Sequence, residues 1–485
     1  MITVGVMSAF VLLFLSISCG HTRPTSVVAR TTLRIGVGGL PLLAPQAGLR
    51  QLISALTLET LVAPNDNGRL RPWLAESWAF AQDGLLLDVE IHKGATFHDG
   101  TPVTSDLVVQ SLLKDLPEPM GPAFNDIQSI QPVTPSRFRI TLTRPSQFIL
   151  DALETAIQKP DKPGVGTGPY MKDPSKTGEL LANTAYYLGR PEIDGVTVST
   201  YPSVRTAWAE LLRGNLDMLH EVNIDALDSL QASTSVAVFS YLRHYQYMIV
   251  FGSHAAGLMS AAVRRELNAA IDRDAIVREA LNGHGRPSIG PIPPDHWALD
   301  PAAPTVKFDR ALARSLSSRH LRFTCLVPAD SVYERVALAV RQQLAGASVD
   351  MDVQEATQEE ILRLTRDNNY DAVLLDLTSG PTVFRSYRAF HSKVTFVPKP
   401  RSSELVDLAL ERIQHASTDM AYRSGVTSFQ QAIVNDPPAL FLVWGERARA
   451  VSRNFEVTAR ERNQDILNTL RFWRPAGPQQ VTPAN

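Results

Sequence analysis

The sequence predicts an α/β protein of two lobes, with mixed sheets and a two-strand hinge between the lobes. Strands and helices alternate with short joints between residues 321 and 377, which is typical of a parallel sheet with right-handed crossovers. The first half is richer in hairpin turns and in short strands bounded by proline, so we expect a larger, mixed lobe there. Two apolar, strand-like segments, 244–251 and 439–444, bracket the second half and are the expected hinge.

The first expected element is a strand over residues 33–37. The glycines Gly36, Gly38 and Gly39 at its end suggest a dinucleotide-binding turn, but Pro41 stands where that motif needs its last glycine. We therefore interpret these glycines as a tight strand exit where backbone approaches a ligand.

Residues 74–113 predict a tightly specified run of turns and strands. Alternating strands meet at an Asp-Gly turn at residues 83–84 and a Lys-Gly turn at 93–94, and His98-Asp99-Gly100 makes a third turn. Thr104 is expected to cap a helix over about residues 105–113, because its hydroxyl can accept a hydrogen bond from the free amides of the first turn.

The second half begins with a strand over residues 321–327. On this strand Cys325 shares a face with Phe323, so we expect a buried thiol. Ser331 and Glu334 then form a capping box that begins a helix. The elements that follow are a helix end at Gly346, a strand over 349–353, a second capping box at Thr357 and Glu360, and a strand over 370–377.

The N-terminus has the features of an export signal. The apolar run at residues 4–17 has the length of a signal-peptide core, and Ser18-Cys19-Gly20 resembles the end of a bacterial lipobox. We expect residues 1–19 to be a lipoprotein-type signal peptide, with Cys19 lipidated and residues 20–30 as a polar tether. Ser16 and the lack of Lys or Arg near the start leave open an uncleaved or differently cut leader.

Several stretches closely resemble the extracellular solute-binding proteins of family 5, the ligand-capturing subunits of oligopeptide, dipeptide and nickel ABC importers. The resemblance runs from about residue 33 to about residue 450. The matching stretches are Pro72, LAESW at 74–78, the two turns at 83–84 and 93–94, FHDGTPVT at 97–104, GTGPY at 166–170, the spaced Asn183, Tyr187, Gly189 and Pro191, and AIDR at 270–273.

This resemblance implies a two-lobe, periplasmic-binding-protein-like fold of type II, cluster C. The larger lobe would comprise residues 31–243 and 446–485, and the smaller α/β lobe residues 244–445. The chain would then be the monomeric substrate-binding component of an ABC importer on the periplasmic or outer side of the membrane. It would deliver a small peptide-like or other polar solute to a permease. The alternative is a ligand-sensing lipoprotein with the same fold and no transport role.

The sequence offers little support for catalysis or for other partners. It holds no GxSxG, HExxH, P-loop or CxxC motif, and its eleven histidines show no metal-ligand spacing. The formal net charge of -2 does not favour nucleic acid. We therefore expect no enzyme, no cofactor, no metal, and contact with a membrane only through the lipid on Cys19.

The expected ligand site lies between the lobes. Tyr245, Tyr247 and Trp444 are candidates for the floor of a cleft, because ligand pockets favour aromatic side chains with a few placed polar groups. Ordinary core packing of these aromatics is the alternative. The candidates for one wall are Thr378, Ser379, Arg385 and Tyr387.

The chemistry of that wall departs from the family. Relatives that bind peptides usually carry an acid there, in a stretch resembling W-x-x-D-x-x-D-P, which pairs with the peptide ammonium. Residues 377–383 read LTSGPTV, and Arg385 and Arg388 lie nearby instead. Because a buried ammonium without a counter-charge is costly, we expect a neutral or anionic solute rather than an ordinary peptide.

Overall fold

The computed structural model describes residues 30–39, 45–252, 255–378, 380–394, 398, 403–458 and 465–477. The predicted signal peptide, Cys19, the tether up to residue 29 and Ser379 lie outside these residues, as does the side chain of Thr378. The segment Thr31–Asn485 is one compact unit. None of the helices described is long and apolar enough to cross a membrane.

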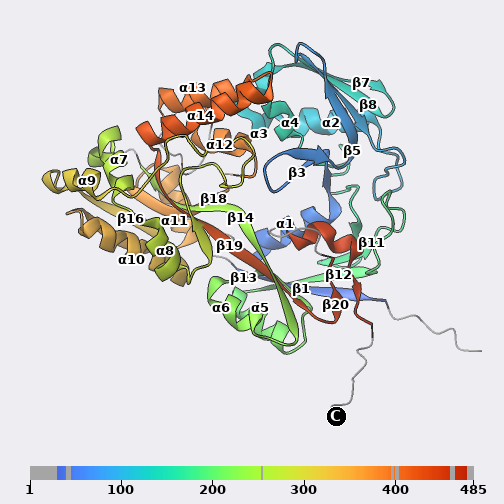
Figure 1. Ribbon diagram of the computed structural model, residues 1–485. Helices are drawn as coiled ribbons and strands as arrows, with labels where there is room; N and C mark the ends of the chain where they lie inside the picture. Colours follow the sequence, from blue (N-terminus) through green and yellow to red (C-terminus); the bar gives the residue numbers. More distant parts are fainter. Residues whose placement is uncertain are drawn as a thin grey trace, which may run out of the picture. The chain divides into compact units, whose positions relative to one another are not determined.

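An eleven-stranded mixed sheet is the backbone of this unit, and Figure 1 shows its long central strands. The strands contributed by the expected larger lobe lie on one side of β19, and those of the expected smaller lobe lie beyond β14, except for β15, which pairs with β19. In sheet order they are β10 (Tyr170–Lys172), β11 (Glu179–Ala182), β12 (Gly195–Tyr201), β1 (Thr32–Gly38), β13 (Met218–Val222), β19 (Ala439–Ser452), β14 (Val236–Phe251), β18 (Ala372–Thr378), β16 (Arg322–Pro328) and β17 (Asp350–Ala356), with β15 (Gly285–Pro287) paired to β19.

The two segments expected to cross between the lobes belong to β14 and β19, which we call the crossing strands. They pair antiparallel from Val236 opposite Ser452 to Val250 opposite Ala439, so the pairing is longer than the sequence indicated. The register shifts between Leu242 and Gln246. The predicted antiparallel connection is therefore present, and its action as a hinge stays a prediction.

The strand-helix alternation of the second half forms the predicted parallel arrangement. β16 is parallel to both β17 and β18, with α10 (Ser331–Ala345) and α11 (Gln358–Arg366) as the crossover helices. Thr357 caps α11 as expected, since its hydroxyl accepts from the Glu360 amide at 3.2 Å.

The predicted cap of α10 was wrong by one residue. Asp330 is the residue that precedes the first helical turn in an extended conformation, and its carboxylate accepts from the amides of Val332 and Tyr333. A capping oxygen must come from that preceding position. Ser331 is already helical, and its hydroxyl instead donates to Asp225 at 3.0 Å.

The predicted turns between residues 74 and 104 are confirmed. Gly84, Gly94 and Gly100 have φ angles of 70°, 83° and 82°, which only glycine adopts without strain. Thr104 accepts from the Leu107 amide at 3.5 Å and caps α2. Around them a four-stranded antiparallel sheet has the order β5 (Ala75–Phe80), β6 (Leu86–Ile91), β8 (Arg137–Leu142) and β7 (Ile127–Thr134), next to α2 (Ser105–Asp115).

The strand exit at Gly38 is tight because of a neighbouring helix. A Cβ atom on Gly38 would lie 2.4 Å from the backbone nitrogen of Val204, the first residue of α5 (Val204–Leu212). The sequence suggested that backbone approaches a ligand at this strand exit. In the structure the backbone that approaches Gly38 is that of α5.

The sheet in residues 244–445 has a packed core on each face. One face carries Phe323 and Cys325 under α7 (Ala261–Ala269), α8 (Arg273–Ala280) and α10, so the buried thiol is confirmed. The other face carries Val373 and Leu375. It packs on α12 (Val383–Phe390), α13 (Glu404–Gln414) and α14 (Asp419–Asn435), and this core continues into the four-stranded sheet.

The remaining elements are short or connect these layers. They are α1 (Pro45–Thr57), β2 (Glu59–Thr60), β3 (Val62–Pro64), β4 (Leu70–Pro72), α3 (Pro117–Met120), η1 (Gly121–Asp126), α4 (Phe148–Ala152), β9 (Ala156–Ile157), α6 (Ile224–Gln231), η2 (Ala256–Leu258), α9 (Arg310–Ala313), η3 (Arg314–Ser318), β20 (Phe455–Glu456), η4 (Ile466–Phe472) and β21 (Arg474–Pro475).

Candidate functional site

The predicted floor residues lie on neighbouring strands but not on one face of the sheet, because Gln246 pairs with Trp444 while Tyr247 pairs with Val443. The side chain of Trp444 therefore points to one face and those of Tyr245 and Tyr247 point to the other, so the structure does not bring these residues together as one floor. Tyr245 is opposite Thr378 on β18, and Trp444 on β19 is opposite Gln246 on β14. The chain then leaves the carboxyl end of β18 and enters α12, which carries Arg385 and Tyr387. Carboxyl ends of strands in α/β sheets are where ligand crevices form, so the location suits a binding site.

Trp444 and Gln246 combine burial with unused hydrogen-bonding capacity. Trp444 is 1% exposed and Gln246 is fully buried. Within the described part of the chain, the indole Nε1 of Trp444 and the carbonyl Oε1 of Gln246 have no hydrogen-bond partner. The Gln246 amide nitrogen donates to the Gly290 carbonyl at 2.7 Å and to the Ser288 hydroxyl. Because buried polar groups are normally paired, this donor and this acceptor, which neighbour each other across the two strands, are the polar atoms of the predicted site that a solute would satisfy.

Two other predicted residues contact the protein core in this conformation. Tyr247 is buried, with its ring 5.2 Å from the ring of Tyr333. Tyr387 is buried against Phe148, at a centroid distance of 5.0 Å. These contacts are what ordinary core packing of the aromatic residues would give. A role of either tyrosine in ligand binding stays a prediction.

A buried ion pair that the sequence did not indicate links β19 to β18. The guanidinium of Arg447 lies 3.0 Å from the carboxylate of Asp376, and also donates to the Tyr247 hydroxyl at 3.5 Å. Burial by itself lowers the pKa of Arg447, but Tyr247 and Asp376 outweigh it and raise that pKa above its usual value. The two residues lie 71 positions apart, and no local motif relates them.

The predicted wall residue Arg385 faces acids from the expected larger lobe. Its guanidinium lies 3.4 Å from the carboxylate of Glu154, just after α4. Burial raises the pKa of Glu154. The pKa of Asp151 on α4 is raised well above its usual range, first by burial and then by the negative charge of Glu154. Arg385 is thus engaged by a carboxylate in this conformation.

Arg388, one helical turn further along α12, is half-buried. Burial and then the charge of Arg385 lower the pKa of its guanidinium. In the described ranges Arg388 makes no ion pair, in contrast to Arg385.

The His98-Asp99 pair serves the scaffold, as its place in a turn predicted. His98 Nε2 lies 3.1 Å from the Gly168 carbonyl, and burial lowers the pKa of its ring. Asp99 forms an ion pair with Lys159 at 2.7 Å. Over the residues with described positions, no group of three or more His, Cys, Asp or Glu side chains is placed to hold a metal ion.

Comparison with known proteins gives a match over most of the chain. The family described as bacterial extracellular solute-binding proteins, family 5 Middle, matches residues 69–393. Among curated proteins, the oligopeptide-binding protein AppA of Bacillus subtilis (strain 168) is 23% identical over 452 residues, covering 82% of this chain and 83% of AppA.

Solved structures share the fold. NikZ from Campylobacter jejuni, solved with Ni(L-His), superposes with a TM-score of 0.78 at 20% identity, covering 91% of this chain and 99% of NikZ. AgaA from A. tumefaciens R10, solved with agropinic acid, gives a TM-score of 0.76 at 19% identity, covering 92% of this chain and 99% of AgaA. At such identities the likeness establishes the fold alone, and it confirms the expected periplasmic-binding-protein-like class.

Proposed function

This chain belongs to the bacterial extracellular solute-binding proteins of family 5, and on that premise we propose that it captures a neutral or anionic polar solute between its two lobes. It acts as the substrate-binding component of an ABC importer, in a family of binding proteins rather than enzymes, and works in the cell envelope. The relatives found give no support to the alternative of a sensing protein.

The unsatisfied pair of Trp444 and Gln246 on the crossing strands carries this proposal. A solute that bonds both side chains would sit where the chain passes from residues 31–243 into residues 244–445 and back. A solute that also contacts both lobes stabilises the closed state by its differential affinity for that state. The permease then recognises the closed, loaded form.

The charges around the wall support a solute without a free ammonium group. Asp376 is neutralised by Arg447, and Glu154 is paired with Arg385. Burial raises the pKa of Asp151, which favours its neutral form. A peptide ammonium would therefore meet two carboxylates that are already paired and one carboxyl group whose burial opposes its ionisation, so burying the ammonium there would be costly. AgaA, which shares the fold, was solved with an organic acid.

The proposal also includes a lipid anchor at Cys19 and the boundaries of the two lobes. Lipidation of Cys19 would tether a monomer to the outer side of the membrane. The larger lobe would comprise residues 31–243 and 446–485, and the smaller lobe residues 244–445. The length of the crossing strands supports this division, because β14 and β19 pair both before Leu242 and after Gln246, with register shifts between Leu242 and Gln246 and between Tyr247 and Met248.

Native mass spectrometry of the purified protein tests the proposal directly. We expect a retained small molecule whose mass corresponds to a neutral or acidic compound, and calorimetric titration with it should show one site. Replacement Trp444→Phe should weaken that binding about threefold to tenfold, because the indole donor is lost.

Trp473→Phe is a matched control for this replacement. Trp473 is equally buried, but its Nε1 already donates to the Thr469 hydroxyl at 3.1 Å, and it packs in a different hydrophobic cluster, near Val451 at the far end of β19. Its replacement should lower stability and leave the solute affinity unchanged. Equal loss of affinity in both variants, or in neither, would contradict a binding role for Trp444.

A further inference from the structure

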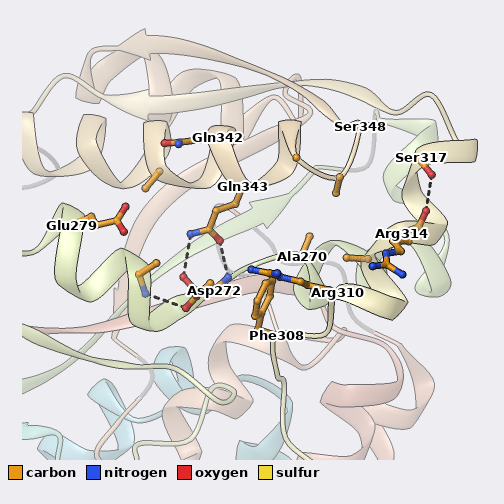
Figure 2. Close-up of a pocket in the computed structure, with 15 residues that line it drawn as sticks. Ala270, Asp272, Glu279, Phe308, Arg310, Arg314, Ser317, Gln342, Gln343 and Ser348 are labelled. Atoms are coloured by element: carbon orange, nitrogen blue, oxygen red, sulfur yellow. Dashed lines mark hydrogen bonds between the residues drawn. The ribbon is translucent and has the colours of Figure 1, made fainter.

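A cavity lies among the helices of residues 244–445, outside the crossing strands. Its volume is about 500 Å³, and Figure 2 shows it between α10 and the segment that runs from α8 to η3. None of its lining residues belongs to β14, β18 or β19. Small side chains make it concave, namely Ala270, Ala275, Ala313, Ala339, Ala347 and Gly346.

Two arginines stand at one end of this cavity with no acidic partner. Arg310 and Arg314 come from α9 and η3, and neither guanidinium forms a hydrogen bond or ion pair with the residues described. The guanidinium carbon of Arg310 lies 5.6 Å from the ring centroid of Phe308, which is 42% exposed. Cation and aromatic surface are thus presented together to a ligand.

The other end of the cavity is acidic and polar. Figure 2 shows Glu279 well separated from the two arginines, with Gln342 above it on α10. Like the arginines, Glu279 makes no ion pair within the part of the chain that the structure describes. The pocket therefore carries a carboxylate toward one end and guanidinium groups toward the other, with the alanines, Asp272 and Gln343 between them.

The cavity is braced by hydrogen bonds between its walls. The Asp272 amide donates to Gln343 Oε1 at 2.6 Å, and Gln343 Nε2 donates to the Asp272 carbonyl at 3.1 Å. The Asp272 carboxylate is used as the cap of α8, accepting from the Ala275 amide at 3.0 Å. These groups tie α10 to the start of α8, the helix that carries Glu279, so these two walls of the cavity are held together.

We propose that this cavity is a second ligand site, selective for a small zwitterion with an apolar middle. Arg310 and Arg314 bind its carboxylate, since the planar guanidinium forms paired, charge-assisted hydrogen bonds with carboxylates. Glu279 receives its ammonium group, and Phe308 with the alanines contacts the apolar part. The volume falls within the usual range for small-molecule pockets.

Three probes with one shared ring test the charge requirement by calorimetry. They are para-aminomethylbenzoate, which is zwitterionic, para-methylbenzoate, which is anionic, and para-methylbenzylamine, which is cationic. We expect the zwitterion to bind most tightly, the anion more weakly and the cation most weakly. Absence of zwitterion binding, or equal affinity for all three probes, would overturn the proposal.

Substitutions of the lining arginines test whether the zwitterion binds in this cavity. Arg310→Ala and Arg314→Ala should each weaken zwitterion binding about tenfold, because each removes a charge-assisted hydrogen bond. Arg366→Ala is the matched control, an exposed arginine at the end of α11 that does not line the cavity. Trp444→Phe should leave zwitterion binding unchanged, which separates this site from the crossing strands. Affinity that is insensitive to Arg310→Ala and Arg314→Ala would refute the assignment.

Discussion

The carboxylate of Asp376 and the guanidinium of Arg447 are 3.0 Å apart, and their ion pair joins β18 to β19 across the intervening strand β14. Their side chains are only 14% and 11% exposed. The pair therefore ties β18 to β19, and it neutralises the acid two residues before the predicted wall residue Thr378. We expect this ion pair to stabilise the packing of β18, β14 and β19 against one another.

Removing the acid from this pair should destabilise the protein strongly. Asp376→Asn leaves the Arg447 charge buried without its counter-ion, and we expect the free energy of unfolding to fall by about 3 kcal/mol. Urea denaturation measures this change. The control is Asp350→Asn, because the Arg322–Asp350 pair is 75% and 65% exposed. Its loss should cost less than about 1 kcal/mol, and similar losses in both variants would contradict the buried role of Asp376.

The charge of the solute should control affinity. Acetylating the amino terminus of a short peptide removes its ammonium group, which would be buried without a counter-charge. The acetylated form should therefore bind at least about tenfold more tightly. Calorimetric titration of both forms measures the difference. Amidating the carboxyl end of the acetylated peptide should weaken binding, because it removes the anion. Tight binding of unmodified di- to pentapeptides would contradict the expected ligand class.

Glu59 should make stability depend on pH. Its carboxylate is buried, and burial raises its pKa from 4.5 to about 7, although hydroxyls of Tyr186 and Thr167 donate to it at 2.5 and 2.8 Å. A carboxyl whose folded pKa is raised binds its proton more tightly in the folded state. This tighter proton binding adds to the free energy of unfolding. The added stability is complete below pH 4.5 and is lost as the pH rises through about 7.

The variant Glu59→Gln isolates this contribution. The free energy of unfolding of the unsubstituted protein, minus that of the variant, should fall by about 3 kcal/mol between about pH 4 and about pH 8. Denaturant unfolding at several pH values measures the difference. A difference that does not change with pH would show that Glu59 keeps its ordinary pKa.

Cys325 should be unreactive until the protein unfolds. Burial raises the pKa of its thiol to about 12, so almost no thiolate forms near neutral pH. The chain has two cysteines, and Cys19→Ser leaves Cys325 as the single thiol. An aromatic disulfide reagent at about pH 8 should then detect no thiol in the native protein and one in urea. Rapid reaction of the native protein would contradict the packing of β16.

Local elements could be predicted from short stretches of sequence. The Asp83-Gly84 turn, the Thr104 cap and the alternation of strands and helices from residue 321 onward each depend on a few neighbouring residues, and the structure contains them. The cap of α10 was misplaced by one residue because Ser331 and Asp330 are both good capping residues. The resemblance to a solute-binding family was also contained in such short stretches, and the family match supports it.

The candidate site depends on contacts that no local pattern encodes. Glu154 and Arg385 are 231 positions apart, and Gln246 reaches Ser288 and Gly290 only after β14 and β15 pair with β19. The sequence determined backbone preferences and periodicity, because steric and hydrogen-bonding constraints act between near neighbours. Tertiary structure decided which charges are paired and which polar atoms are buried without partners. Burial and desolvation are properties of the whole packed chain, and they set the energy of every charge in the site.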